Sequence, residues 1–424
     1  MSRDLLLMYE DIKVLSINFD TGDINVFNAE ALPFTLKRRL RKVPRFSEIK
    51  SDYEDTQRQI AIGKNKECFT SWLANRTLSL SRKNAKWLYN LIKVEQLDSV
   101  QVKSRVAILC RAVSVLDNYW LKLDGDTTTW SDINVRHVSL NEVIAQVALH
   151  GKSLTLQGSL CSPELTTNGA YAKAWRRFPD GLHLFKLGHD GNTESRIEVM
   201  CSNLLDKMNV EHCHYEAGED DGKYVCVCPA MTTDKISMLP GMDFISYCNV
   251  NGKQWEKELI ELDSDNFYKM WIVDFLLANR DRHGQNWGLW YKPDTMQLVG
   301  LHPLFDHNNA FDKEWLEDRS AIYQISDKSI MESAKFAMSK VDFHFTDEIT
   351  RDDFITKRQY DEFKKRAEIL GVKTLCSYED KVRTRLSQLH VNLPLKEVMK
   401  LLPSAELKGD ALDKALIEIR RLNS

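Results

Sequence analysis

The stretch Ala278-Asn-Arg-Asp-Arg-His-Gly-Gln-Asn-Trp-Gly288 decides the fold of this chain. The residues that lead into it, 267–278, are nearly all apolar and predict a buried helix. The sequence then changes abruptly from apolar to polar residues, and Asp281 and Asn286 follow within a few residues of the helix end. Polar groups held at the end of a stiff element are typical of functional sites.

A β-hairpin is expected directly after this loop. Residues 287–291 predict a strand, Lys292-Pro-Asp294 predicts a turn, and residues 297–305 predict the returning strand. The returning strand ends at Asp306. A buried helix and a hairpin therefore present Asp281, Asn286 and Asp306 from adjacent backbone positions.

These three side chains suit phosphoryl transfer. That reaction needs an oriented nucleophile, held phosphates and a metal that neutralises their charge. The carboxylate of Asp281 can accept the hydrogen bond of an attacking hydroxyl, and the oxygens of Asn286 and Asp306 suit Mg²⁺. Arg282 and His283 are expected to brace the loop. A single Asp in a loop is usually a cap or turn residue, so the interpretation depends on the combination.

The loop resembles the catalytic loop of HipA-like kinases, which reads Asp-Arg-His-x-x-Asn. The resemblance implies a protein-kinase-like fold with two lobes, and phosphorylation of Ser or Thr on protein targets with ATP and Mg²⁺. It implies that Asp281 and Asn286 are catalytic, that Asn286 and Asp306 bind the metal, and that His283 and Asp306 contribute to nucleotide binding. The residues after Asp306 are His-Asn-Asn rather than Phe-Gly, so a protein-kinase-like flip of that segment is not expected.

Two upstream segments extend the resemblance. Phe185-Lys186-Leu187 is similar to the strand whose lysine reaches the nucleotide phosphates, and Glu198 stands where the following helix pairs with that lysine. On a strand, Lys186 faces away from both of its apolar neighbours. A lysine confined to a cleft needs an anionic partner, and Glu198 is a candidate. The alternative is a surface lysine and a solvated helical glutamate.

The segment Thr166-Thr-Asn-Gly-Ala-Tyr-Ala-Lys173 resembles the phosphate-covering loop of the same family. The resemblance implies that Thr166, Thr167, Gly169 and Lys173 bind the nucleotide, and that Thr166 is a site of autophosphorylation, as a Ser is in toxin-type members. Backbone amides near Gly169 could hold phosphates. Tyr171 and Ala172 depart from the toxin-type pattern, and with one glycine the segment alone also fits an ordinary polar turn.

Taken together, the patterns predict an α+β protein in three parts. Residues 1–112 form an N-terminal accessory unit, 113–240 a sheet-rich kinase small lobe with the phosphate loop, and 241–424 a helical large lobe. A cleft between a small and a large lobe is a usual place for a ligand.

Composition excludes several function classes. The 424-residue chain has a net charge of −3, so direct binding to nucleic acid is not expected. Its start is not that of a signal peptide, and its longest apolar stretch is too short to span a membrane. Nine cysteines without framework spacing suggest reduced thiols and a cytoplasmic location.

A metal site is conceivable where His212-Cys213-His214 precedes Cys226-Val-Cys228. Side chains two apart on a strand share a face, so these groups could meet at an ion. The spacing fits no common zinc pattern, and the cysteines lie in an apolar strand. Buried structural thiols are therefore the favoured interpretation.

Two other functions stay open beside a Ser/Thr protein kinase. A kinase for a lipid or small molecule would use a similar loop, although Asp312, Glu314, Glu317 and Asp318 after Asp306 would repel an anionic head group. A non-catalytic nucleotide-binding module is the second alternative. The protein substrate is not visible in the sequence, and a toxin role with an antitoxin partner is open.

Overall fold

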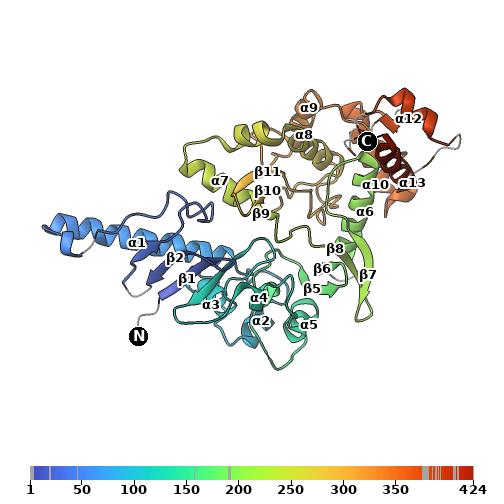
Figure 1. Ribbon diagram of the computed structural model, residues 1–424. Helices are drawn as coiled ribbons and strands as arrows, with labels where there is room; N and C mark the ends of the chain where they lie inside the picture. The colour runs from blue at the N-terminus through green and yellow to red at the C-terminus, as the bar shows by residue number, and fades with distance from the viewer. Residues whose placement is uncertain are drawn as a thin grey trace.

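The computed structural model describes residues 4–18, 21–44, 46–156, 158–189, 192–374, 382–383, 385–386, 389, 391, 393–403, 407 and 410–423. Within these ranges the chain forms three antiparallel sheets and a set of helices that dominate its second half (Figure 1). Among the described residues, no helix is both long and apolar enough to cross a bilayer.

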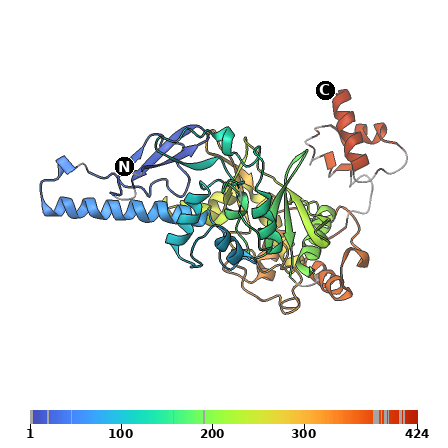
Figure 2. The same ribbon diagram turned by 90° about the horizontal axis from the view of Figure 1, so that it is seen from below.

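The N-terminal part combines a four-stranded sheet with three helices. Its strands are β1 (Asp4–Tyr9), β2 (Ile12–Asn18), β3 (Ile24–Val26) and β4 (Tyr119–Leu123), in the order β3-β2-β1-β4. A short 3-10 helix, η1 (Phe46–Glu48), and the helices α1 (Asp52–Asn75), α2 (Ala85–Leu91) and α3 (Val100–Leu109) complete it. The long α1 projects from the body of the molecule (Figure 2).

The second part carries a four-stranded sheet with the order β5-β6-β8-β7. Its strands are β5 (Ala172–Phe178), β6 (Gly181–Leu187), β7 (Glu216–Asp220) and β8 (Lys223–Pro229), and its helices are α4 (Trp130–Ile133), α5 (Glu142–His150), η2 (Pro163–Leu165) and α6 (Thr193–Met208). Residue Lys173 of β5 stands opposite Lys186 of β6. Helix α6, which carries Glu198, follows β6 in the chain, as the resemblance implied.

The third part is mainly helical around a small sheet. Its elements are β9 (Ser237–Pro240), α7 (Gly241–Val250), α8 (Trp255–Leu276), β10 (Gly288–Lys292), β11 (Gln297–Leu301), α9 (Ile330–Met338), η3 (Arg351–Asp353), α10 (Lys357–Leu370), α12 (Leu395–Leu401) and α13 (Asp410–Asn423). The second half of α8, after a kink at Asp263, is buried as its apolar sequence predicts. The predicted hairpin is β10–β11, and β9 adds a third strand beside β10.

The predicted α+β class, with a sheet-rich lobe before a larger helical lobe, is confirmed. The exact boundaries at 112 and 240 stay predictions. Near the first of them, β4 belongs to the same sheet as β1, so the chain returns to the N-terminal sheet before it enters the small lobe. The accessory part and the small lobe are therefore linked by strand pairing.

Candidate active site

A fully buried arginine organises the predicted catalytic loop. Arg282 donates two hydrogen bonds to Asp274 of α8, from Nε at 2.9 Å and from Nη2 at 2.8 Å. Its Nη1 donates to the backbone carbonyls of Asn286 at 2.5 Å and of Phe305 at 2.8 Å. One side chain thus joins the helix, the loop and the residue that precedes Asp306, and the bidentate pair gives it a defined orientation.

The half-buried Asp281 projects from this loop. Its Oδ2 accepts a 2.7 Å hydrogen bond from Asn309 Nδ2, and its backbone carbonyl accepts one of 2.7 Å from Asn286 Nδ2. His283 Nε2 lies 3.7 Å from Asp281 Oδ1. About one third of the Asp281 side chain is exposed, so the carboxylate is held in place while solvent still reaches it.

Lys186 and Asp306 meet in the cleft between the two lobes. Lys186 Nζ donates to Asp306 Oδ1 at 3.0 Å and to Tyr215 Oη at 2.9 Å, and it lies 3.5 Å from Glu198 Oε1. The same Glu198 oxygen accepts the backbone N–H of Asp306 at 3.0 Å. The strand lysine, the helix glutamate and the aspartate after the hairpin therefore form one cluster.

Charge in this cluster shifts the pKa of its members. Burial alone would lower the pKa of Lys186, but the carboxylates of Asp306 and Glu198 outweigh it and raise that pKa well above its ordinary value. Burial would raise the pKa of Asp306, but Lys186 and Lys173 hold it well below its usual range. The lysine is consequently cationic and the aspartate anionic at neutral pH.

The oxygen donors of Asn286 and Asp306 fit a hard divalent cation. Asn286 uses its Nδ2 to hold the Asp281 carbonyl, so its Oδ1 is the atom that remains for a metal. Asp306 is ionised and has a left-handed backbone with φ of 63°. A non-glycine residue in that region is strained, and such strain is often found at functional sites.

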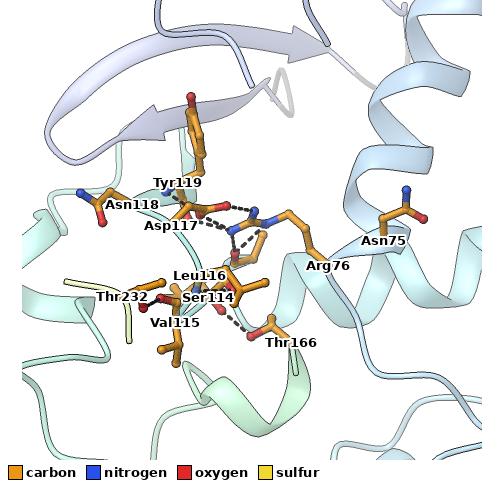
Figure 3. A network of polar contacts seen from close by, with 12 residues as sticks. Asn75, Arg76, Ser114, Val115, Leu116, Asp117, Asn118, Tyr119, Thr166 and Thr232 are labelled. Atoms are coloured by element: carbon orange, nitrogen blue, oxygen red, sulfur yellow. Dashed lines mark hydrogen bonds and ion pairs between the residues drawn. The ribbon is translucent and has the colours of Figure 1, made fainter. Parts of the chain in front are cut away.

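The phosphate loop lies over β5, and both of its threonines are engaged. Thr166 is buried, and its Oγ1 donates to the Val113 carbonyl at 2.7 Å. Figure 3 shows Thr166 pointing toward the segment that carries Ser114 and Val115. Thr167 Oγ1 donates to the Pro163 carbonyl at 2.7 Å. In this conformation the Thr166 hydroxyl is turned away from solvent.

Gly169 and Lys173 lie against one another in the same loop. Gly169 has φ of 111°, and a Cβ atom there would come within 2.2 Å of Lys173 Nζ. Lys173 Nζ donates to the Asn168 carbonyl at 2.8 Å. Burial, reinforced by the neighbouring charge of Lys186, lowers the pKa of Lys173 to about 7.

Sequence reasoning missed several residues that hold this site. Arg82, between α1 and α2, is fully buried and donates to the carbonyls of Glu164 at 2.8 Å, of Thr167 at 3.1 Å and of Lys173. Nothing in the sequence around Arg82 indicated this role. The accessory part therefore supports the phosphate loop directly.

A second arginine of the accessory part fixes the segment under Thr166. Arg76 forms a bidentate pair with Asp117, at 2.6 and 2.8 Å, and its Nε donates to the Ala112 carbonyl at 3.1 Å (Figure 3). Because both side chains are largely buried, the loss of either one would leave the other as a buried charge without its partner. Nothing in the local sequence around Arg76 predicts that partner, which is 41 residues away.

The sheet-rich part and the helical part thus bring Lys186, Glu198 and Asp306 together in one cluster. No protein-family model matches the sequence, and no curated protein matches it.

The solved structures that are similar to the chain include the following two. The first is the proinflammatory kinase CtkA of Helicobacter pylori, with 15% identity over 49% of this chain and 91% of that one, at a TM-score of 0.35. The second is a toxin–antitoxin system complex of Shewanella oneidensis MR-1 that contains HipA, HipB and operator DNA, with 10% identity over 98% and 95% of the chains, at a TM-score of 0.44. At these identities the similarity concerns the fold, and the proposed function depends on the site itself.

Proposed function

We propose that this protein is an ATP- and Mg²⁺-dependent Ser/Thr protein kinase of the HipA-like kind. The observation that carries the proposal is the buried cluster in which Lys186 contacts Asp306 at 3.0 Å and lies 3.5 Å from Glu198. A fully buried cation shared by two carboxylates costs desolvation energy, and it is retained in proteins where it serves specificity or function. The chain has all five polar residues that are expected of an active kinase site, which are Lys186, Glu198, Asp281, Asn286 and Asp306.

Each residue has a distinct role in the proposed reaction. Asp281 accepts the hydrogen bond of the substrate hydroxyl and orients its oxygen for attack. Lys186 and Lys173 supply positive charge to the phosphates, and Gly169 lets the backbone approach them. Asn286 and Asp306 would hold Mg²⁺, which neutralises charge on the transferring phosphoryl group when it is bound. Arg282 keeps Asn286 and the segment before Asp306 in register.

A protein substrate is favoured over an anionic lipid by the surface after Asp306. Asp312, Glu314 and Glu317 are exposed there, although Glu317 Oε1 accepts from Arg358 Nη2 at 3.1 Å and Asp318 Oδ2 from Arg280 Nη1 at 3.2 Å. An acidic surface beside the candidate base would repel a phosphorylated head group and attract a basic segment of a protein.

Label transfer from ATP tests the proposal. The purified chain is incubated with labelled ATP and Mg²⁺, alone, with a cell lysate and with lipid vesicles. Wild type is expected to label protein, and Asp281→Asn to lose about 100-fold or more in turnover with nucleotide affinity nearly unchanged. Asp306→Ala should also weaken metal-dependent nucleotide binding. Asp294→Asn, at an exposed position in the hairpin turn, is the matched control and should act as wild type.

The same experiment separates the other functions. Label found only in lipid would favour the lipid kinase, and tight nucleotide binding without any transfer would favour a non-catalytic module. Normal turnover in both Asp281→Asn and Asp306→Ala would show that the site assignment is wrong.

Autophosphorylation and an antitoxin partner belong to the same proposal and are supported by the sequence resemblance. The Thr166 hydroxyl is bound to the Val113 carbonyl, so modification there requires the loop to leave this position. Phosphopeptide mapping after incubation with ATP tests whether Thr166 is phosphorylated. Modification found only at other residues would show that Thr166 is not the autophosphorylation site. Co-purification with the protein encoded beside this chain tests the partner.

A further inference from the structure

Three side chains with metal-ligating atoms lie together at the end of α6, outside the proposed active site. Asp206 stands in the last turn of α6, and His212 and His214 follow in the connection to β7. Their ligand atoms all lie within 4.8 Å of one another. Asp206 Oδ1 is 3.5 Å from His214 Nδ1 and 4.0 Å from His212 Nε2.

A backbone hydrogen bond presents one of the two histidines as a ligand. His212 Nδ1 lies 2.8 Å from the Val210 carbonyl oxygen. Because a carbonyl can only accept, Nδ1 carries the hydrogen, and Nε2 of the neutral ring bears the lone pair, which accepts from Ser202 Oγ at 3.0 Å and would turn to a bound ion instead. Metal-bound histidines commonly donate their other N–H to a carbonyl in this way, which fixes the ring orientation.

The position of the histidine segment is fixed by the neighbouring chain. The backbone N–H of Cys213 donates to the Leu304 carbonyl at 2.8 Å, and the N–H of Leu304 donates to the Glu211 carbonyl at 3.0 Å. His212 is buried, and its Nε2 also lies 3.0 Å from Ser202 Oγ. The position of His212 is thus set by the fold, whereas exposed Asp206 and His214 can adjust to an ion.

We propose that Asp206, His212 and His214 bind a divalent transition-metal ion, with Zn²⁺ as the best fit. Two imidazoles and one carboxylate match the ligand preference of zinc, and the exposed side leaves the fourth position to water. In a tetrahedral zinc site with bonds of about 2.0–2.2 Å, the ligand atoms lie roughly 3.4 Å apart. The 3.5 Å between Asp206 Oδ1 and His214 Nδ1 is close to this value, and the exposed Asp206 and His214 side chains would have to move toward the buried His212 Nε2 to complete the site.

The thiols that the sequence placed beside these histidines are not part of this site. Cys213 lies in a buried cluster with Cys226, Cys228 and Tyr215, as the structural interpretation predicted. The third member of the set is instead Asp206, a helix residue six positions before His212.

The site lies on a segment that also reaches the catalytic cluster. Tyr215, directly after His214, accepts the hydrogen bond from Lys186 Nζ at 2.9 Å, and Leu304 precedes Asp306 by two residues. A bound ion would stabilise this connection and, through it, the position of Tyr215 under the lysine.

Metal titration of the full chain tests the proposal without any measurement of kinase activity. Protein stripped by a chelator is titrated with Zn²⁺ against a chromophoric competitor, and Co²⁺ is added in parallel as a spectroscopic probe. Wild type is expected to bind one Zn²⁺, and Co²⁺ should give tetrahedral visible bands without thiolate charge-transfer bands. Asp206→Asn and His214→Ala, both at exposed positions that folding should tolerate, should each weaken zinc binding at least 10-fold.

Two control variants make the result specific. His137→Ala removes another exposed histidine that is 2.7 Å from an aspartate, Asp234, and should leave zinc affinity unchanged. Asp306→Ala should also leave it unchanged, which separates this site from the Mg²⁺ site. Equal zinc affinity in wild type and His214→Ala, thiolate bands with Co²⁺, or no zinc binding by wild type would each overturn the proposal.

Discussion

Tyr171 and Asn309 connect the phosphate loop to the catalytic loop. Tyr171 Oη donates to Asn309 Oδ1 at 2.9 Å, and Asn309 Nδ2 donates onward to Asp281 Oδ2 at 2.7 Å. The two residues are 138 positions apart and lie on opposite sides of the cleft. The loop is therefore closed over the site by one hydrogen bond, and a nucleotide entering from this side must break it.

Tyr171→Phe is expected to ease nucleotide entry. The substitution removes the hydroxyl that makes this bond and keeps the ring. A net hydrogen bond contributes about 0.5–1.5 kcal/mol, so the open form and the nucleotide association rate should increase by about 2- to 12-fold. Stopped-flow binding of a fluorescent ATP analogue measures this rate. Tyr224→Phe, on β8, is the control, and slower association in Tyr171→Phe would contradict the interpretation.

Arg282→Met is expected to destabilise the protein severely. Removing the arginine leaves Asp274 fully buried without its cation, which costs about 3–5 kcal/mol in comparable cases. The neighbouring Arg280→Met breaks a partly exposed pair with Asp318 and should cost about 1 kcal/mol or less. Urea unfolding of both variants measures the difference. Similar losses in the two would show that the Asp274 pair does not organise the loop.

The sequence predicted the parts of the site whose signal is local. The run of apolar residues before Asp281 predicted a buried helix, and the turn at Lys292-Pro-Asp294 predicted the hairpin, although its second strand ends at Leu301 rather than at residue 305. Lys186 was recognisable because it interrupts an apolar strand. In each case a few adjacent residues carried the pattern.

The supporting residues could not be predicted, because their contacts join distant parts of the chain. Arg82 lies 91 residues before Lys173, whose carbonyl it holds, and in sequence it looks like any solvated arginine. Tyr171 was noted only as a departure from the family pattern, and its partner Asn309 had no signal. Long-range polar contacts depend on the assembled fold, which the local pattern does not encode.

Gly169→Ala should weaken nucleotide binding through Lys173. An alanine at this position adopts a disfavoured positive φ. Its Cβ would lie 2.2 Å from the present position of Lys173 Nζ, so the lysine side chain would have to move. Gly181→Ala, at the first residue of β6, has φ of 137° and meets no atom within 4 Å, so it carries the backbone strain alone. Calorimetric titration with ATP and Mg²⁺ should show weaker binding only for Gly169→Ala. An equal loss in both variants would assign the effect to strain.

Lys173 should make nucleotide binding depend on pH. Its pKa is lowered to about 7, first by burial and then by the charge of Lys186, with Arg82 adding to the effect and Asp306 and Glu198 opposing it. At pH 8 the free protein therefore holds Lys173 mostly neutral, whereas at pH 6 it is mostly protonated. Anionic phosphates favour the charged form and raise the pKa in the complex.

Binding should consequently take up a proton at pH 8 and little at pH 6, and affinity should fall as the pH rises through 7. Calorimetry in two buffers of different ionisation enthalpy measures this proton uptake. Lys173→Met, titrated with the same nucleotide and metal, measures the proton uptake of the nucleotide itself, and subtracting it from the wild-type uptake leaves the contribution of Lys173. Unchanged proton uptake in Lys173→Met would show that another group titrates, and would remove Lys173 from the phosphate site.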